Sequence, residues 1–313
     1  MAIIKTRINK KINNTVNTIY PYTTSDMVEY TNSTSVKDGL DSIDSVLEGF
    51  SHNSIFRGKD LGTITAANID DFVTSHGIPT GEFTDLYLGD YFTMDYNGTN
   101  MVFRIAGFDT HWNIGDNASG LDSDVITILN RHHICVVPDY RLFTHSMNTT
   151  NTTGASENEN NTSGLKAYAG SDMFQIVMPE VNATLSAILG SHLLKFREIL
   201  ANNIDTNAIA ANLPTAKGAT NGWGWYTCQA NLMSEIELYG SIVWSSNGFN
   251  TGTAKHQLPL FAKAPKYINL SRSYFWLRDV ATAAGFCYCN TYGNANYGNA
   301  SSAGGVRPRF LIG

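Results

Sequence analysis

The chain has 313 residues, of which 42% are hydrophobic and 11% aromatic, so it can bury a sizeable core and is not wholly disordered. Only 15% of residues are charged and the formal net charge is −6, which argues against a nucleic-acid partner that needs a basic surface. No segment approaches the ~18 apolar residues of a membrane span, and the N-terminus lacks the apolar core of a secretory signal. We therefore expect a protein that is made in a cytoplasm, without membrane insertion.

Residues 1–34 are polar and have no sustained helical or strand period. Ser35 then offers a helix cap, Asp38 lies near the positive end of the helix dipole, and Gly49 marks the far end. Between them, apolar residues follow at heptad spacing: Val36, Leu40, Ile43, Leu47 and Phe50. Two heptads suit either an amphipathic helix packed on its own domain or a short oligomerising bundle, and the pattern leaves both open.

The segment 51–82 is typical of a linker, with a short helix at 65–73 that Gly77-Ile78-Pro79 ends. Two strands are expected at 86–94 and 100–108. The Asn97-Gly98 pair between them is a strong hairpin signal, because both residues tolerate positive φ. A third strand is expected at 133–137, where Pro138 ends it.

The second half of the chain mixes helical and extended patterns. Residues 146–164 form a polar loop of low complexity. Ser171 to Asn203 looks helical in two parts, 179–189 and a short turn at 193–196, and a further helix is expected at 230–239. The remaining expectations are an aromatic loop at 222–225, loops at 240–270 and short aromatic strands at 274–313.

No catalytic motif is recognisable in the sequence, and the acidic residues are scattered singly. A glycosidase carboxylate pair is therefore neither found nor excluded, since such pairs form in space. Cys287 and Cys289 would share one face of a strand, but a structural zinc site needs about four ligands and Cys135 and Cys228 are isolated. We expect buried free thiols, and we predict no catalytic residue, no metal site and no cofactor.

The C-terminal part contains the most informative segment, in which Tyr and Asn alternate with small residues over 286–300. One face of a hairpin would then present rings and amides. Tyr offers a large contact area for little rotamer entropy, and Asn offers adaptable donors and acceptors. The predicted receptor-binding residues are Tyr288, Asn290, Tyr292, Asn294, Asn296, Tyr297 and Asn299. The alternative is that they are cross-strand pairs and turn residues, and the pattern alone leaves both open.

These residues resemble a domain-of-unknown-function family found in phage tail and surface proteins. The resemblance covers about 83–313. Its C-terminal motifs are Trp276-Leu277-Arg278, the hairpin 286–300 and Gly305-Val306-Arg307-Pro308. Its upstream motifs are Gly89-Asp90-Tyr91-Phe92, Arg104-Ile105-Ala106-Gly107-Phe108-Asp109, Leu232-Met233-Ser234-Glu235-Ile236 and Tyr239-Gly240. Two features depart from the family pattern: Arg309, where relatives often end in Arg-Pro-Ala, and the Cys-x-Cys of the hairpin.

The resemblance implies an α+β fold: an N-terminal anchor and a short amphipathic or coiled-coil helix, followed by a C-type-lectin-like head with short strands and long loops. The implied domains are a virion-attachment region with an oligomerising helix at 1–50, a joint at 51–82 and the head at 83–313. The attachment region is similar to that of phage fibre proteins in two runs, Thr23–Tyr30 and Ser35–Leu40, and Phe56–Leu61 resembles the joint. In the head, the Trp and Arg of the two C-terminal motifs would be internal framework, while the hairpin faces outward.

The expected function is that of a bacteriophage virion protein of the tail-fibre type, assembled in the bacterial cytoplasm. A homotrimer would bind a host cell-surface glycan or protein without catalysis, and several weak heads per fibre would supply avidity. Its N-terminal region would contact other virion proteins. Two alternatives are a purely structural fibre, baseplate or capsid-decoration protein and an enzyme on the same fold.

Overall fold

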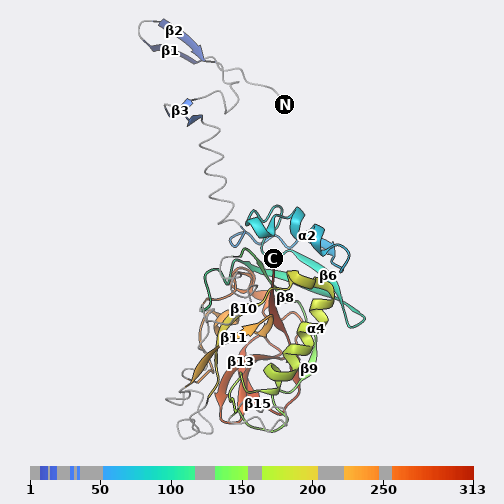
Figure 1. Cartoon of the computed structure of the whole chain (residues 1–313). Coiled ribbons are helices and arrows are strands. Elements are labelled where there is room, and N and C mark those ends of the chain that lie inside the picture. The colour runs from blue at the N-terminus through green and yellow to red at the C-terminus, as the bar shows by residue number, and fades with distance from the viewer. Residues whose placement is uncertain are drawn as a thin grey trace. The chain divides into compact units, whose positions relative to one another are not determined.

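The computed structural model divides the chain into two units, Met1–Ser51 and His52–Gly313. The structure describes residues 8–12, 15–19, 29–31, 34–35, 52–116, 131–153, 164–203, 222–246 and 256–313. Among these residues the fold is mixed α+β, mostly sheet with few helices (Figure 1). This confirms the α+β class predicted from the sequence.

The first unit contains two short antiparallel strand pairs. β1 (Ile8–Ile12) pairs with β2 (Thr15–Ile19), and β3 (Glu29–Thr31) pairs with β4 (Thr34–Ser35). The sequence did not predict these strands, because polar segments can pair through backbone hydrogen bonds without a hydrophobic period. The predicted heptad helix at 36–50 lies outside the described residues.

In the second unit, the larger described sheet has six strands in the order β12-β17-β8-β7-β6-β5. Their bounds are β5 (Asp60–Thr63), β6 (Tyr91–Tyr96), β7 (Thr99–Phe108), β8 (Ile134–Pro138), β12 (Ala230–Leu232) and β17 (Pro308–Ile312). Asn97 and Gly98 close the β6–β7 hairpin with φ of 52° and 81°, which confirms the predicted turn. β6 begins five residues later than expected, because Gly89 has a φ of 83° that interrupts the extended backbone.

The second sheet has five strands in the order β15-β14-β13-β16-β9. Their bounds are β9 (Phe143–His145), β13 (Phe275–Thr282), β14 (Gly285–Cys289), β15 (Ala295–Asn299) and β16 (Gly304–Val306). The strands expected at 274–313 are therefore confirmed. The chain passes directly from β8 to β9 and from β16 to β17, so two continuous segments join the sheets.

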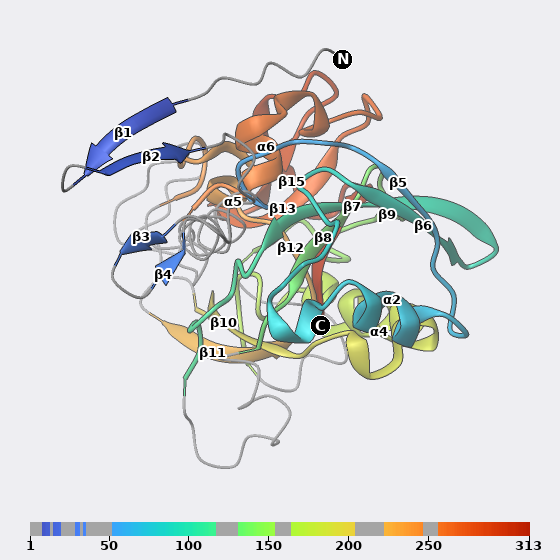
Figure 2. The ribbon, with the colours of Figure 1, turned by 90° about the horizontal axis from the view of Figure 1, so that it is seen from above.

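The helices lie against these sheets. α4 (Met178–Leu189), preceded by the π-helical turn η4 (Met173–Val177) and followed by the 3₁₀ turn η5 (Gly190–His192), contacts β6 and β12 and thus crosses the six-stranded sheet. This confirms the helix predicted at 179–189. The segment expected to be a linker contains α2 (Ile69–Ser75), which confirms the short helix predicted at 65–73, and the 3₁₀ turn η2 (Ile78–Thr80). α2, labelled in Figure 2, contacts η5.

Two predictions in the middle of the chain were wrong because the elements depend on non-local pairing. Instead of a helical turn at 193–196, the chain enters β10 (Phe196–Ala201). Instead of an aromatic loop at 222–225, it forms β11 (Trp223–Cys228), antiparallel to β10. No local pattern reveals a partner strand more than twenty residues away, and Trp223 is 45% exposed rather than packed.

The helix predicted at 230–239 is divided. Its first residues form β12, which pairs with β17, and α5 (Glu235–Tyr239) begins only after Ser234. Ser234 and Glu237 form a capping box that fixes this later start. Short helical segments, α6 (Pro259–Lys263) and η6 (Pro265–Tyr267), interrupt the region expected to be loops. α5 contacts α6 and β13, while α6 contacts β7, so the two helices bridge the sheets.

The motif residues that the resemblance placed inside the head are buried. Trp276, Arg278 and Arg307 are at most 3% exposed. Arg307 lies where the chain passes from β16 to β17, and its guanidinium donates hydrogen bonds to the backbone carbonyls of Pro138, Tyr267 and Ile268. Within the described part of the chain, no helix is long and apolar enough to cross a membrane.

Candidate functional site

The predicted binding residues lie on the hairpin of β14 and β15, at one edge of the five-stranded sheet. The antiparallel register places Tyr288 opposite Asn296 and Cys287 opposite Tyr297. β15 pairs only with β14 among the described strands, so it is the edge strand of the described sheet. The turn between the two strands projects the residues from Asn290 to Asn294 away from the ladder.

Asn290 holds this turn together. Its Oδ1 accepts hydrogen bonds from the backbone N–H groups of Tyr292 (2.9 Å) and Asn294 (3.0 Å). Its backbone N–H donates to the carbonyl of Asn294, and its carbonyl accepts from Gly293, whose φ is 88°. An Asn side chain that bonds to the backbone ahead of it is a recurrent means of fixing a turn. Asn290 therefore fixes the conformation of the turn.

The loop that follows η6 supports the same turn. The amide nitrogen of Asn269 donates to the carbonyl of Asn290 (2.7 Å) and to that of Ser273 (3.0 Å). Its Oδ1 accepts from the hydroxyl of Ser271 (3.1 Å). The half-buried amide of Asn269 thus ties the hairpin to residues 269–273, so the turn is held against this loop.

Between the turn and this loop is an open pocket of about 580 Å³, which we call the tip pocket. Its lining residues are Pro265, Lys266, Ile268, Asn269, Arg272, Thr291, Tyr292 and Gly293. Tyr292 is 89% exposed, so almost its whole ring is available to a ligand. The ammonium of Lys266 lies 5.0 Å from the ring centroid of Tyr267, a cation–π contact that favours one placement of the side chain.

The other predicted tyrosines are packed. Tyr288 contacts Trp276 edge-on with ring centroids 5.8 Å apart, and it also contacts Tyr274. Tyr297 packs on Trp244 at 5.1 Å, and the Trp244 indole donates to the carbonyl of Ala295. The Tyr288–Trp276 contact is the cross-strand packing that the sequence left open as the alternative, whereas Tyr297 packs on a residue outside the sheet.

The seven predicted residues therefore do not form one surface. Tyr292, Asn294 and Asn299 are exposed, while Tyr288, Asn290, Asn296 and Tyr297 are half-buried. Asn299 pairs with Gly285 at the far end of the hairpin, four residues along β15 from Ala295, or ~13 Å from the turn. Of the seven, only Tyr292 lines the tip pocket.

Sequence reasoning missed the polar residues that line the tip pocket together with Tyr292. Lys266, Asn269 and Arg272 come from a region expected to be loops, where single polar residues carry no signal of function. The hydrogen bond from Asn269 to the carbonyl of Asn290 ties this region to the turn.

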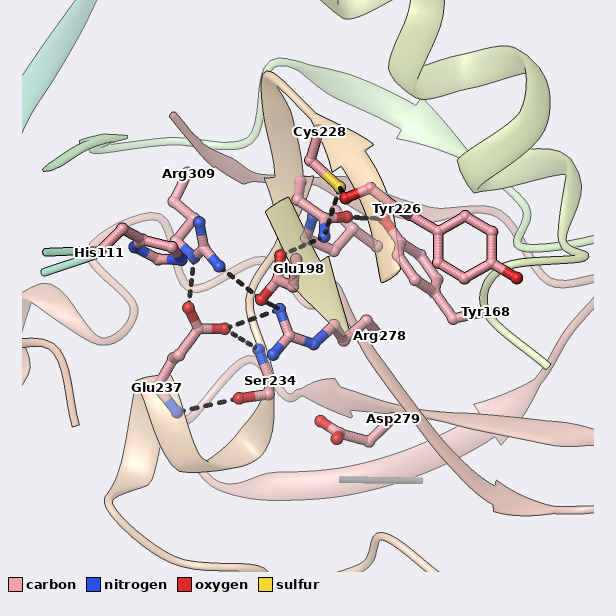
Figure 3. A network of polar contacts seen from close by, with 12 residues as sticks. His111, Tyr168, Glu198, Tyr226, Cys228, Ser234, Glu237, Arg278, Asp279 and Arg309 are labelled. Carbon is pink, nitrogen blue, oxygen red and sulfur yellow. Dashed lines mark hydrogen bonds and ion pairs between the residues drawn. The ribbon is translucent and has the colours of Figure 1, made fainter. Parts of the chain in front are cut away.

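A second polar cluster lies in the interior and is shown in Figure 3. Arg278 on β13 and Arg309 on β17 both contact Glu198 on β10, at 2.5 and 2.7 Å, and both also contact Glu237 on α5. Burial raises the pKa of Glu237, but the charges of Arg309 and Arg278 outweigh this effect and leave the pKa below its ordinary value. All four side chains are buried and paired, so these two carboxylates form a structural network that joins both sheets.

Arg309 is thus an internal ion-pair partner. The four cysteines are also buried and unpaired: Cys135, Cys228, Cys287 and Cys289. Burial raises the pKa of Cys289 to about 11 and that of Cys287 well above its ordinary value, so neither thiol readily becomes a nucleophilic thiolate. The prediction of buried free thiols is confirmed. In the described residues, no three His, Cys, Asp or Glu side chains are grouped to hold a metal ion.

No protein-family model, curated protein or solved structure matches this chain. The tip pocket, with its exposed aromatic ring and its supported turn, is the candidate functional site.

Proposed function

We propose that this protein is a bacteriophage virion protein of the tail-fibre type, which binds a glycan of the host cell surface at the tip pocket without catalysis. The observation that carries the proposal is the ring of Tyr292, 89% exposed on a turn that Asn290 and Asn269 hold in place. An aromatic ring can stack on the apolar face of a sugar, and a preformed site avoids the entropic cost of ordering a loop.

The finer expectations of the resemblance belong to this proposal. The head would be C-type-lectin-like, the burial of Trp276, Arg278 and Arg307 being consistent with that framework. The first unit would contact other virion proteins, and the chain would act as a homotrimer. Three weak sites on one fibre would then give the avidity that a shallow pocket lacks.

The test is binding of the labelled full chain to an array of bacterial capsular polysaccharides and lipopolysaccharides. Tyr292→Ala should reduce saturable binding by roughly 10-fold, because it removes the stacking surface. Trp223→Ala, which removes an exposed ring from β11 in a different sheet, should leave binding unchanged. Equal loss in both variants, at unchanged melting temperature, would contradict a site at the tip pocket.

A purely structural role is the second candidate, favoured by one observation. Ile242 and Val243 are each 48% exposed, next to Trp244, which packs on β15, the edge strand of the described sheet. An exposed apolar pair beside an edge strand suits contact with a neighbouring protein. In that role the full chain would bind no glycan on the array and would self-associate, which sedimentation velocity of the same sample measures.

A further inference from the structure

The charges around the tip pocket carry information beyond the exposed ring. Lys266 and Arg272 both line the pocket, and none of its described lining residues is acidic. This is contrary to the composition of the chain, in which 27 acidic residues outnumber 21 Lys and Arg. The pocket is therefore a locally cationic surface on an acidic protein.

Both cations are also left unpaired. Within the described ranges, neither Lys266 nor Arg272 has a carboxylate partner. Five other arginines of the second unit are paired with acidic side chains, while Arg131 and Arg307 donate to backbone carbonyls; the five are Arg57, Arg104, Arg197, Arg278 and Arg309. Lys266 and Arg272 are thus two cations without a described carboxylate partner that line the same pocket as Tyr292.

The backbone conformation of Arg272 is a further reason to regard the position of this residue as fixed. Its φ is 48°, in the left-handed region that a residue with a side chain rarely adopts. The flanking serines hold this conformation, since the Ser271 hydroxyl accepts from the Ser273 N–H (3.3 Å) and donates to Asn269. Asn269 in turn supports the Tyr292 turn, so one hydrogen-bonded loop fixes the arginine and the hairpin together.

We infer that the glycan bound at the tip pocket carries an acidic group, a carboxylate or a phosphate ester, that binds between Lys266 and Arg272 while a sugar ring stacks on Tyr292. Arginine presents a planar fork that matches both oxyanions, and lysine adds a point charge. The inference rests on the proposed glycan-binding function and specifies its ligand. Two cations are too few for the backbone contacts of a nucleic acid, which makes an acidic polysaccharide the better occupant.

The experiment measures binding of the full chain to three immobilised polymers: polygalacturonate for the carboxylate, poly(glycerol phosphate) for the phosphate, and dextran as the neutral control. The wild type should bind one or both acidic polymers, prefer them to dextran by at least ~10-fold, and lose affinity as NaCl rises from 50 to 300 mM. The arm that binds more tightly identifies the acidic group.

Lys266→Gln/Arg272→Gln should lower affinity for the acidic polymer by at least ~10-fold. Lys263→Gln, which removes an exposed charge from α6 outside the pocket, should leave the affinity for the acidic polymer unchanged. Binding that is equal for acidic and neutral polymers, or absent for both acidic ones, would overturn the inference.

The variants also separate this inference from the proposed function. If Tyr292→Ala abolishes binding to the glycan array while the double Gln variant retains it, the glycan site stands and the acidic ligand is rejected. If neither variant changes binding to the array, the tip pocket is not the site, and both proposals fall.

Discussion

At the scale of single residues, Asp279 on β13 is a buried carboxyl group whose environment disfavours its charged form. Its Oδ2 accepts a hydrogen bond from the backbone N–H of Glu235 (2.6 Å), and its Oδ1 has no partner among the described residues. Burial, followed by the negative charge of Glu235, raises the pKa of Asp279 to about 8 from its ordinary 3.8. The folded protein therefore keeps this proton at neutral pH.

This shift predicts the direction of the pH dependence of stability. Above about pH 4 the unfolded chain releases the proton, while the folded chain holds it up to about pH 8. The free energy of unfolding should therefore fall as pH rises through this window, by on the order of 1 kcal/mol per pH unit. Thermal unfolding between pH 6 and 8 measures the slope, and Asp279→Asn, which resembles the protonated acid, should flatten it. An equal slope in wild type and variant would show that Asp279 does not hold the proton.

At the scale of elements, α5 is a five-residue helix whose start is fixed by the same glutamate that enters the interior ion-pair network. Glu237 accepts from the Ser234 N–H (2.8 Å) as part of the capping box and also contacts Arg309 and Arg278. Capping and ion pairing therefore depend on one side chain. Because β13, β17 and β10 supply the other partners, α5 helps to fix their spacing.

The two roles of Glu237 can be separated by substitution. Ser234→Ala removes only the cap and should lower the free energy of unfolding by about 1 kcal/mol. Glu237→Gln leaves two buried arginines with one carboxylate and should lower it by about 3–5 kcal/mol. Urea titration of both variants gives the comparison. Similar losses for the two would mean that the network contributes little beyond the cap.

Elements defined by local chemistry were predictable, and those defined by distant partners were not. The β6–β7 turn follows from Asn97 and Gly98, and α4 follows from Pro179 and its apolar spacing. β10 and β11 were missed because each is a strand only by virtue of the other. The site shows the same limit: the sequence singled out Tyr292, but Lys266 and Arg272 approach it only through the folded loop that Asn269 anchors.

At the scale of the whole molecule, the two sheets of the second unit share their chain connections. β8 continues into β9, and β16 into β17, so each sheet contains strands continuous with the other. The interior network adds side-chain contacts between β13 and β17 through shared glutamates. Because the sheets share these segments, unfolding of one sheet would disrupt the other. We therefore expect the second unit to unfold in a single cooperative transition.

A chain that begins at His52 tests this expectation. The described buried core lies entirely within residues 64–312, so the shortened chain should fold by itself. Differential scanning calorimetry should show one transition, with a calorimetric enthalpy equal to the van't Hoff enthalpy. Two separate transitions would instead mean that the sheets unfold independently despite their shared segments.

The position of β17 also determines when the six-stranded sheet can be completed during protein synthesis. This strand pairs with β8 on one side and β12 on the other, although residues 139–307 separate it from β8 along the chain. A ribosome adds roughly 5–20 residues per second, so this stretch takes roughly 10 to 35 seconds to synthesise. During this time, the edge of the apolar strand β8 that will pair with β17 has no partner strand and can contact other nascent chains. Yield in a producing cell should accordingly depend on chaperone supply and translation speed more than on the stability of the finished protein.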